Sequence, residues 1–127
     1  TVRVRPLRLL VVDDVDMNRQ MILRALRKDG HQMQEAADGQ EAVAMALAQP
    51  FDVILMDLLM PEMDGQTASR KIRSELPEPK RSTPIIALTA NADKEELARS
   101  LECGMNECML KPFNRSLLIN RVLSYVA

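Results

Sequence analysis

The fold of this chain is decided by residues 53–65, which read VILMDLLMPEMDG. The four apolar residues from Val53 to Met56 run directly into Asp57, and a proline and an Asp-Gly pair follow as turn residues. A continuous apolar run bounded by turn residues is typical of a strand buried on both faces, as in a parallel sheet. Asp57 then stands at the carboxyl end of that strand, which is where open α/β sheets bind their ligands. A lone Asp at this place more often simply ends the strand. Whether Asp57 is functional therefore depends on which residues lie at the ends of the other strands.

Strand-like and helix-like patterns alternate along the rest of the chain. Short apolar runs between turn residues predict strands, and apolar residues at helical spacing predict helices. The alternation favours an α/β fold, in which a doubly wound five-stranded parallel sheet is covered by helices on both faces through right-handed crossovers. We interpret residues 1–7 as a linker and residues 8–127 as one domain. The predicted strands are 8–14, 31–36, 51–57, 84–90 and 107–111, the predicted helices are 16–29, 40–49, 64–75, 92–103 and 114–126, and 76–83 is predicted to be an exposed loop.

The spacing of apolar residues also predicts which side of each helix packs on the sheet. Gly30 and Gly104 are suited to end two of the helices, and Asn114 is suited to cap the last one. The weakly patterned strand 31–36 is expected at the edge of the sheet. The residues predicted to face inward are Met17, Met21, Ile22, Ala25 and Leu26; Ala42, Val43, Ala46 and Leu47; Ala68 and Ile72; Leu97, Ala98 and Leu101; and Leu117, Leu118, Val122 and Val126.

The composition argues against several classes of protein. A chain of 127 residues can form one domain with a real core. The formal net charge of −1, with one Tyr, two Phe and no Trp, gives no support for nucleic-acid binding through a basic surface or base stacking. Cys103 and Cys108 fit no metal-binding or redox spacing and are expected to be free thiols in a reducing compartment. No stretch is apolar for long enough to span a bilayer, and no signal peptide is expected.

Chemically complementary side chains are expected to meet at one edge of the sheet, because the carboxyl ends of parallel strands share an edge. Three carboxylates brought together repel one another, so a cation is expected among them. Mg²⁺ is the natural choice, since it prefers oxygen ligands and binds through one or two carboxylates together with phosphate oxygens. An amine and a hydroxyl would serve the other side of a phosphoryl group, which indicates phosphoryl transfer onto a carboxylate. The residues at these strand ends are Asp13, Asp14, Asp57, Thr89 and Lys111.

The chain resembles the receiver domain of two-component response regulators over essentially its whole length. The resemblance is carried by VVDD at 11–14, MDLLMPEMDG at 56–65, PIIALTA at 84–90 and LKPF at 110–113, which are highly specific together. It implies a flavodoxin-like (receiver) fold with the strand order 2-1-3-4-5. Asn18 and the segment LTANA at residues 88–92 are more similar to the receivers of hybrid sensor histidine kinases than to those of DNA-binding regulators.

The resemblance implies a role for each acidic residue of the motif. Asp57 is expected to be the phosphoacceptor that attacks a phosphohistidine on a partner. Mg²⁺ is expected to be bound by Asp57, directly by Asp14, largely through water by Asp13, and by the backbone carbonyl of Leu59. Many relatives carry a polar residue where Leu59 stands, so we expect this side chain to hinder attacking water and to lengthen the phosphoryl lifetime.

The resemblance also implies how the phosphoryl group is held. Its oxygens are expected to contact Lys111, the Thr89 hydroxyl and the Ala90 amide, and the Lys111-Pro112 bond is expected to be cis, against about one X-Pro bond in twenty. Cys108 stands where many relatives have an aromatic residue whose rotamer follows the threonine. Signalling through such an aromatic switch is therefore in doubt here, whereas movement that starts at Thr89 is still expected.

The function implied is a phosphorylatable switch in a His-Asp phosphorelay. The partner is expected to be a histidine kinase or a histidine phosphotransfer domain, because His31, the only histidine, lies at a strand start far from the acidic edge. We expect no contact of this domain with nucleic acid or membrane, a cytoplasmic location, and no enzymatic activity beyond self-phosphorylation and slow autodephosphorylation. The chain starts at Thr1 without a methionine, so we expect a longer parent protein, and whether that parent is a membrane-anchored histidine kinase stays open.

Two other functions fit parts of the pattern. A Mg²⁺-dependent phosphohydrolase with an aspartyl-phosphate intermediate would, in the haloacid dehalogenase type, carry a second Asp where Leu59 stands, and would need a substrate cap for which the chain has no room. A flavodoxin-like cofactor carrier would need Ser, Thr or Gly in the loop after the first strand, where this chain is acidic.

Overall fold

The computed structural model describes residues 7–27, 30–58, 63–89, 94–110 and 115–125 of the chain. Five parallel strands form a single sheet with the order β2-β1-β3-β4-β5. None of the helices described is both long and apolar enough to cross a membrane. The strands are β1 (Arg8–Val12), β2 (Gln32–Ala36), β3 (Val53–Asp57), β4 (Ile85–Thr89) and β5 (Glu107–Leu110). The helices are α1 (Asp16–Arg27), α2 (Gly39–Ala48), α3 (Gly65–Glu75), α4 (Lys94–Glu102) and α5 (Arg115–Ser124), and a short 3-10 helix, η1 (Lys80–Ser82), lies in the predicted loop.

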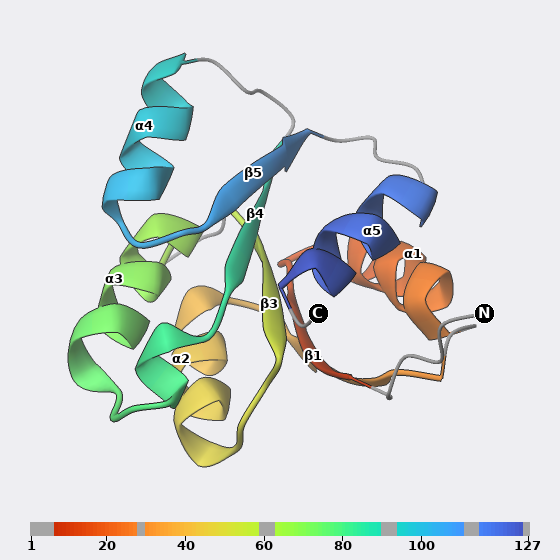
Figure 1. Cartoon of the computed structure of the whole chain (residues 1–127), viewed down its shortest axis with the longest axis horizontal. Coiled ribbons are helices and arrows are strands. Elements are labelled where there is room, and N and C mark those ends of the chain that lie inside the picture. The colour runs from red at the N-terminus through yellow and green to blue at the C-terminus, as the bar shows by residue number, and fades with distance from the viewer. Residues whose placement is uncertain (1–6, 28–29, 59–62, 90–93, 111–114, 126–127) are drawn as a thin grey trace.

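This topology confirms the α/β fold and the implied order 2-1-3-4-5, with β2 at one edge as predicted. Helices α1 and α5 lie on one side of the sheet, and α2, α3 and α4 lie on the other (Figure 1). Because successive side chains of a strand point to opposite faces, each strand contributes to two cores. In β1, Leu9 and Val11 pack in the core with α1 and α5, whereas Leu10 and Val12 pack in the core with α2 and α3.

The central strand β3 is buried along its whole length, as its apolar run predicted. Its neighbour β4 is buried in the same way. Both strands have a neighbour on each side and helices on both faces, so neither offers a solvent-facing position for a polar residue. The edge strand β2 differs, since Ala36 is its only fully buried residue.

The predicted starts of α2 and α3 agree with the structure to within one residue, and local chemistry explains them. Asp38 and Asp64 each accept a hydrogen bond at 2.8 Å from the amide three residues further along, at the starts of α2 and α3. These bonds satisfy amides that have no partner within the helix. Gly30 and Gly104 have φ values of +79° and +99°, which L-residues rarely adopt, so both glycines suit the helix ends at which they lie.

The predicted inward face of α1 is partly wrong. Met17 and Met21 are 72% and 61% exposed, while Leu23 is buried beside Ile22 and Leu26. A helix turns about 100° per residue, which puts Met21 on the far side of Ile22 from Leu23. The position of the helix on the sheet, which the local pattern does not contain, selected the side with Leu23.

The predicted inward face of α4 is wrong throughout. Leu97 and Leu101 are 38% and 48% exposed, and Ala98 is exposed as well. Ser100 and Cys103 face inward instead, at 0% and 2% exposure. The reason is that α4 packs on the edge strand β5. Ser100 also meets α3, where Nε2 of Gln66 donates to its hydroxyl oxygen at 3.3 Å. 

The remaining helix predictions have mixed outcomes. Leu47 and Leu117 are 52% and 43% exposed, contrary to the prediction, and Val126 and the cap Asn114 lie outside the described residues. Ala25 and Val43 are partly buried against the core. The predicted inward residues that are confirmed as buried are Ile22, Leu26, Ala42, Ala46, Ala68, Ile72, Leu118 and Val122.

The packed domain includes Leu7, one residue before the predicted boundary. Leu7 is 0% exposed and belongs to the core with α1 and α5. Its carbonyl oxygen accepts a hydrogen bond from the amide of Gln32 at 2.8 Å, and its own amide donates to Nδ1 of His31 at 3.0 Å. These bonds extend the pairing of β1 with β2 toward the amino ends of the strands. His31 therefore stabilises the sheet at the end away from the acidic residues.

Candidate functional site

Three carboxylates meet at the carboxyl edge of the sheet, as predicted. Asp13 and Asp14 follow β1, Asp57 is the last residue of β3, and Val12 pairs with Met56 in adjacent strands. One carboxylate oxygen from each Asp lies within 4.8 Å of the others. Asp13 and Asp57 are 0% and 7% exposed, whereas Asp14 is exposed. Among the three carboxylates, Asp14 is thus the one that is open to solvent.

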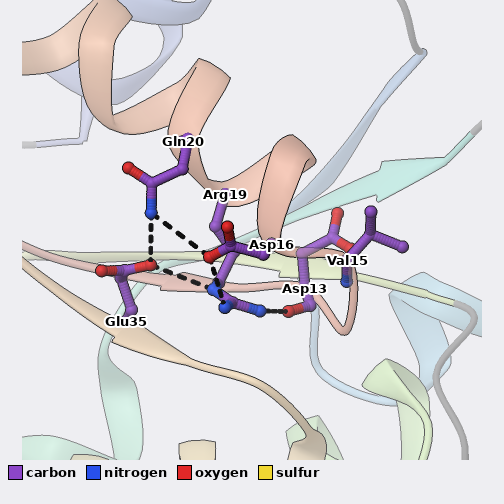
Figure 2. Close-up of polar contacts among 6 residues, drawn as sticks. All are labelled: Asp13, Val15, Asp16, Arg19, Gln20 and Glu35. Atoms are coloured by element: carbon purple, nitrogen blue, oxygen red, sulfur yellow. Dashed lines mark hydrogen bonds and ion pairs between the residues drawn. The ribbon is translucent and has the colours of Figure 1, made fainter.

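Asp13 is held by hydrogen bonds on its backbone and on its side chain. Its amide donates to the carbonyl oxygen of Ala36 at 3.1 Å, and its Oδ1 accepts from the amide of Val15 at 2.9 Å. Its carbonyl oxygen accepts from Nη1 of Arg19 at 2.7 Å (Figure 2). The turn formed by Asp13 and Val15 explains why β1 ends at Val12 and not at residue 14 as predicted.

Thr89 joins the same edge from β4. It is the last residue of that strand and is 5% exposed. Asp57 pairs with Leu88 in the register of β3 and β4, so Thr89 is one residue further along the neighbouring strand. On its other side Thr89 pairs with Leu110, the last residue of β5. The predicted site residues Leu59, Ala90 and Lys111, together with the predicted cis bond at Lys111-Pro112, lie outside the described residues.

Cys108, expected from the resemblance to stand at the position of an aromatic switch, lies in β5. It pairs with Ala87 of β4, is partly buried, and packs against the core with α2 and α3. Cys103 is buried, and no disulfide joins it to Cys108. Cys108 therefore lies at the margin of the core and not on the open surface.

A polar network that was not predicted lies beneath the acidic edge. Arg19 of α1 joins Asp13 to Asp16 and to Glu35 of β2, and Gln20 contacts the same two acids. The spacing of Asp16 and Arg19 on one helix is a weak signal that was available. The pairing with Glu35 had no signal, because it depends on how β2 lies beside β1.

The donor set of the acidic cluster fits a hard divalent cation. Carboxylate oxygens are the ligands that Mg²⁺ prefers, and three of them converge here with one side open for water or a phosphoryl group. Like charges at this separation repel, and a cation removes that repulsion. The residues present would therefore accommodate Mg²⁺.

Comparison with known proteins identifies relatives over most of the chain. A family model described as "Response regulator receiver domain" matches residues 9–123. The sensor protein EvgS of Escherichia coli (strain K12) is 39% identical over 112 residues, which cover 88% of this chain and 9% of EvgS. The transcriptional regulatory protein SrrA of Staphylococcus aureus (strain NCTC 8325 / PS 47) is 34% identical over 114 residues, which cover 90% of this chain and 45% of SrrA. The chain therefore spans less than half the length of these relatives.

Solved structures show the same fold. The receiver domain of sensor histidine kinase PA1611 from Pseudomonas aeruginosa PAO1 has a TM-score of 0.87 and 38% identity, over 96% of this chain and 98% of that one. In that structure a magnesium ion is coordinated in the active site cleft. Chemotaxis protein CheY4 of Vibrio cholerae has a TM-score of 0.87 and 32% identity, over 95% of this chain and 99% of that one. The likeness to receivers of sensor kinases, expected from Asn18 and residues 88–92, is thus confirmed.

Proposed function

This chain belongs to the response regulator receiver domain family of two-component systems, and we propose that it accepts a phosphoryl group on Asp57 from a phosphohistidine of a partner protein, with Mg²⁺, and changes conformation in response. The observation that carries the proposal is the convergence of Asp13, Asp14 and Asp57 within 4.8 Å. A nearly buried carboxylate at the end of a central strand, with two further acids beside it, suits transfer of a phosphoryl group onto the protein.

The chemistry assigned to Asp57 is an exchange of one bond to phosphorus for another. A carboxylate oxygen of Asp57 forms the O–P bond while the N–P bond to the partner's imidazole breaks. The imidazole nitrogen keeps the electron pair of the broken bond and then takes up a proton. Because Asp57 is 7% exposed, the donor histidine must enter from the open side of the cluster, where Asp14 lies.

The other residues of the site neutralise charge and hold oxygens. Mg²⁺ would be held by Asp13, Asp14, Asp57 and the carbonyl of Leu59, and when bound it offsets the negative charge of the carboxylates and the phosphoryl oxygens. Proximity to β3 supports the assignment of the Thr89 hydroxyl to one phosphoryl oxygen. Lys111 and the Ala90 amide, which directly follow β5 and β4 in the sequence, are assigned to the remaining oxygens.

The donor is a histidine kinase or a histidine phosphotransfer domain. His31 cannot serve as the donor within the chain, because it is 8% exposed, bonded through Nδ1 to the amide of Leu7, and placed at the opposite end of the sheet. We place the domain in the cytoplasm with that partner and assign no contact with nucleic acid or membrane to it. Whether the chain is part of a sensor kinase or of a separate regulator is a property of the parent protein.

The response to phosphorylation is assigned to the surface formed by α4, β5 and α5. Thr89 pairs directly with Leu110 of β5, so a movement of Thr89 toward a phosphoryl group reaches β5 without an intermediary. Apolar side chains lie exposed on all three elements, as expected for a surface that binds a partner protein. They are Leu97, Leu101, Leu110 and Leu117, at 38%, 48%, 52% and 43% exposure.

The test is incubation with a small phosphodonor, acetyl phosphate, and Mg²⁺. We expect stoichiometric, acid-labile and hydroxylamine-sensitive phosphorylation that Asp57→Asn abolishes. Asp38→Asn is the matched control, because Asn caps a helix as well as Asp does and the residue lies outside the cluster. Labelling of Asp57→Asn at the level of the unsubstituted chain would overturn the proposal. Rapid multiple turnover would indicate a phosphohydrolase instead, and a bound yellow chromophore would indicate a carrier.

A further inference from the structure

Arg19 makes three directed interactions beneath the acidic edge. Its Nη1 donates to the carbonyl oxygen of Asp13 at 2.7 Å, its Nη2 to Oδ1 of Asp16 at 2.9 Å, and its Nε to Oε1 of Glu35 at 3.0 Å. The side chain of Arg19 is 15% exposed, although it lies at the end of the first turn of a surface helix. Figure 2 shows the guanidinium between the three partners, which come from the β1–α1 loop, α1 and β2. One planar group therefore ties three elements together.

The partners of Arg19 are themselves held. Nε2 of Gln20 donates to Oε1 of Glu35 at 3.2 Å and to Oδ1 of Asp16 at 3.4 Å, so the two carboxylates that flank the guanidinium share a second donor. Glu35 pairs with Val11 in the register of β1 and β2. The next residue of β2, Ala36, accepts the amide hydrogen bond of Asp13. The network is thus anchored on the strand that also holds the backbone of Asp13.

The charge of Arg19 and the geometry of Arg19 act on the acidic cluster in opposite directions. As a positive charge near Asp13, Arg19 would weaken the binding of a cation. Its contact, however, is with the backbone carbonyl of Asp13, and the two carboxylates of Asp16 and Glu35 offset its charge. The remaining effect of Arg19 on the acidic cluster is to fix the geometry of the backbone, because a guanidinium donates in fixed directions that an ammonium cannot reproduce.

We infer that Arg19 is a positioning residue for the cation site: by fixing the carbonyl of Asp13, it holds the peptide that carries the Asp13 and Asp14 carboxylates facing Asp57. The Asp13 carboxylate is already tied to the amide of Val15, so rotation of this peptide would turn the loop and its carboxylates together. This inference rests on the proposed function, in that Asp13, Asp14 and Asp57 hold Mg²⁺. Mutation of a group that orients the ligands of a metal typically lowers the affinity of the site for that metal 10- to 100-fold.

The test is titration of the unphosphorylated chain with MgCl₂ at constant ionic strength, followed by amide shifts in ¹H–¹⁵N spectra. We expect Arg19→Met to weaken Mg²⁺ binding about tenfold, although it removes a positive charge. Arg19→Lys keeps the positive charge but loses the fixed donor directions of the guanidinium. We therefore expect it to weaken Mg²⁺ binding as well, by a smaller factor. The control is Arg24→Met, which removes the same charge from an exposed position of α1 and should leave binding unchanged or slightly tighter.

The sign of the effect separates the explanations. If Arg19 acted through charge alone, Arg19→Met would bind Mg²⁺ more tightly and Arg19→Lys would bind it as the unsubstituted chain does, and this result would overturn the inference. A purely structural role would lower the urea midpoint without Mg²⁺ and leave the affinity of the folded chain unchanged, which would overturn it too. If Arg19→Met does not fold, the Mg²⁺ affinity of Arg19→Lys alone tests the inference. Absence of Mg²⁺ binding by the unsubstituted chain would refute the proposed function itself, and this inference with it.

Discussion

Gly65 packs so closely against Asp57 that a Cβ on Gly65 would lie 2.3 Å from the carbonyl oxygen of Asp57. The same Cβ would lie 3.0 Å from Cγ of Met56, and the amide of Gly65 donates to the carbonyl oxygen of Leu58 at 3.1 Å. The first residue of α3 therefore rests on the backbone of the strand that carries Asp57, the proposed phosphoacceptor. This glycine is required by a close approach between two elements, in addition to its place in the Asp-Gly turn.

Replacing Gly65 with Ala is expected to destabilise the domain by about 1–3 kcal/mol, because the colliding atoms belong to the backbone of β3 and cannot move aside cheaply. Urea denaturation measures the change in the free energy of unfolding. The displacement should also reach the acceptor, so the folded fraction of Gly65→Ala should react more slowly with acetyl phosphate. Thr67→Ala, at an exposed position of α3, is the control and should change neither quantity appreciably. A Gly65→Ala chain with unaltered stability would show that the close approach is unimportant.

Arg73 of α3 is expected to be a principal stabiliser of the sheet at the end away from the site. Its guanidinium donates to three backbone carbonyl oxygens, those of Gly104 at 2.9 Å and of Arg81 and Thr83 at 2.7 Å, and to Oδ1 of Asn106 at 3.0 Å. Burial lowers the pKa of the guanidinium below its ordinary value. Arg73→Met would remove these four hydrogen bonds, although Oδ1 of Asn106 would still accept from the amide of Ile85, at a cost of about 2 kcal/mol in the free energy of unfolding.

The comparison that tests this role of Arg73 is with Arg70→Met, which removes the same charge from an exposed position one turn earlier in α3. Its effect should stay within about 0.5 kcal/mol. Phosphorylation of the folded Arg73→Met chain should be unaffected, because the network lies at the opposite end of the sheet from Asp57. Equal losses of stability in the two variants would mean that the hydrogen bonds of Arg73 contribute little.

Tyr125 is expected to titrate unusually late. Burial raises the pKa of Tyr125 to about 12, and the hydrogen bond that its hydroxyl donates to Glu107 adds to the effect. The unfolded chain loses this proton near pH 10, so the folded state binds more protons between about pH 10 and 12, and its stability falls as the pH rises through that range. Phenolate absorbance measures the titration without ambiguity, since the chain has one Tyr.

Glu107→Gln should move the pKa of Tyr125 part of the way back toward 10, because it removes the negative charge and leaves the burial in place. Circular dichroism at each pH would confirm that the chain is still folded when the absorbance is read. A native midpoint equal to the midpoint in concentrated urea would contradict the assignment.

Leu59→Asn is expected to shorten the lifetime of the phosphorylated chain, because a polar side chain two residues after the acceptor would admit and orient water where an apolar one hinders it. A tenfold increase in the rate of dephosphorylation would correspond to ~1.4 kcal/mol in the barrier. The decay of phosphorylated protein after removal of the phosphodonor measures the rate. Leu59→Met, which keeps the position apolar, should decay as slowly as the unsubstituted chain, and an unchanged rate in Leu59→Asn would refute the prediction.

The alternation of strands and helices, and the polar residues at the strand ends, could be predicted from the amino-acid sequence alone. An apolar run such as 53–56 identifies a buried strand because the period of its side chains is a local property. Asp13, Asp14, Asp57 and Thr89 could be assigned to one edge because parallel strands all point the same way, and the structure brings these residues together.

The sides of the helices that face the sheet, and the contacts between distant residues, became visible in the folded structure and could not be predicted. The burial of Ser100 in place of Leu97 follows from the packing of α4 on β5 and from the contact of Ser100 with Gln66 of α3. The contact of Arg19 with Glu35 depends on the register of β1 against β2, and the fit of Gly65 on Asp57 depends on how α3 leaves β3. Local periodicity contains no information on these relationships, because each is set by the packing of elements that are far apart in the chain.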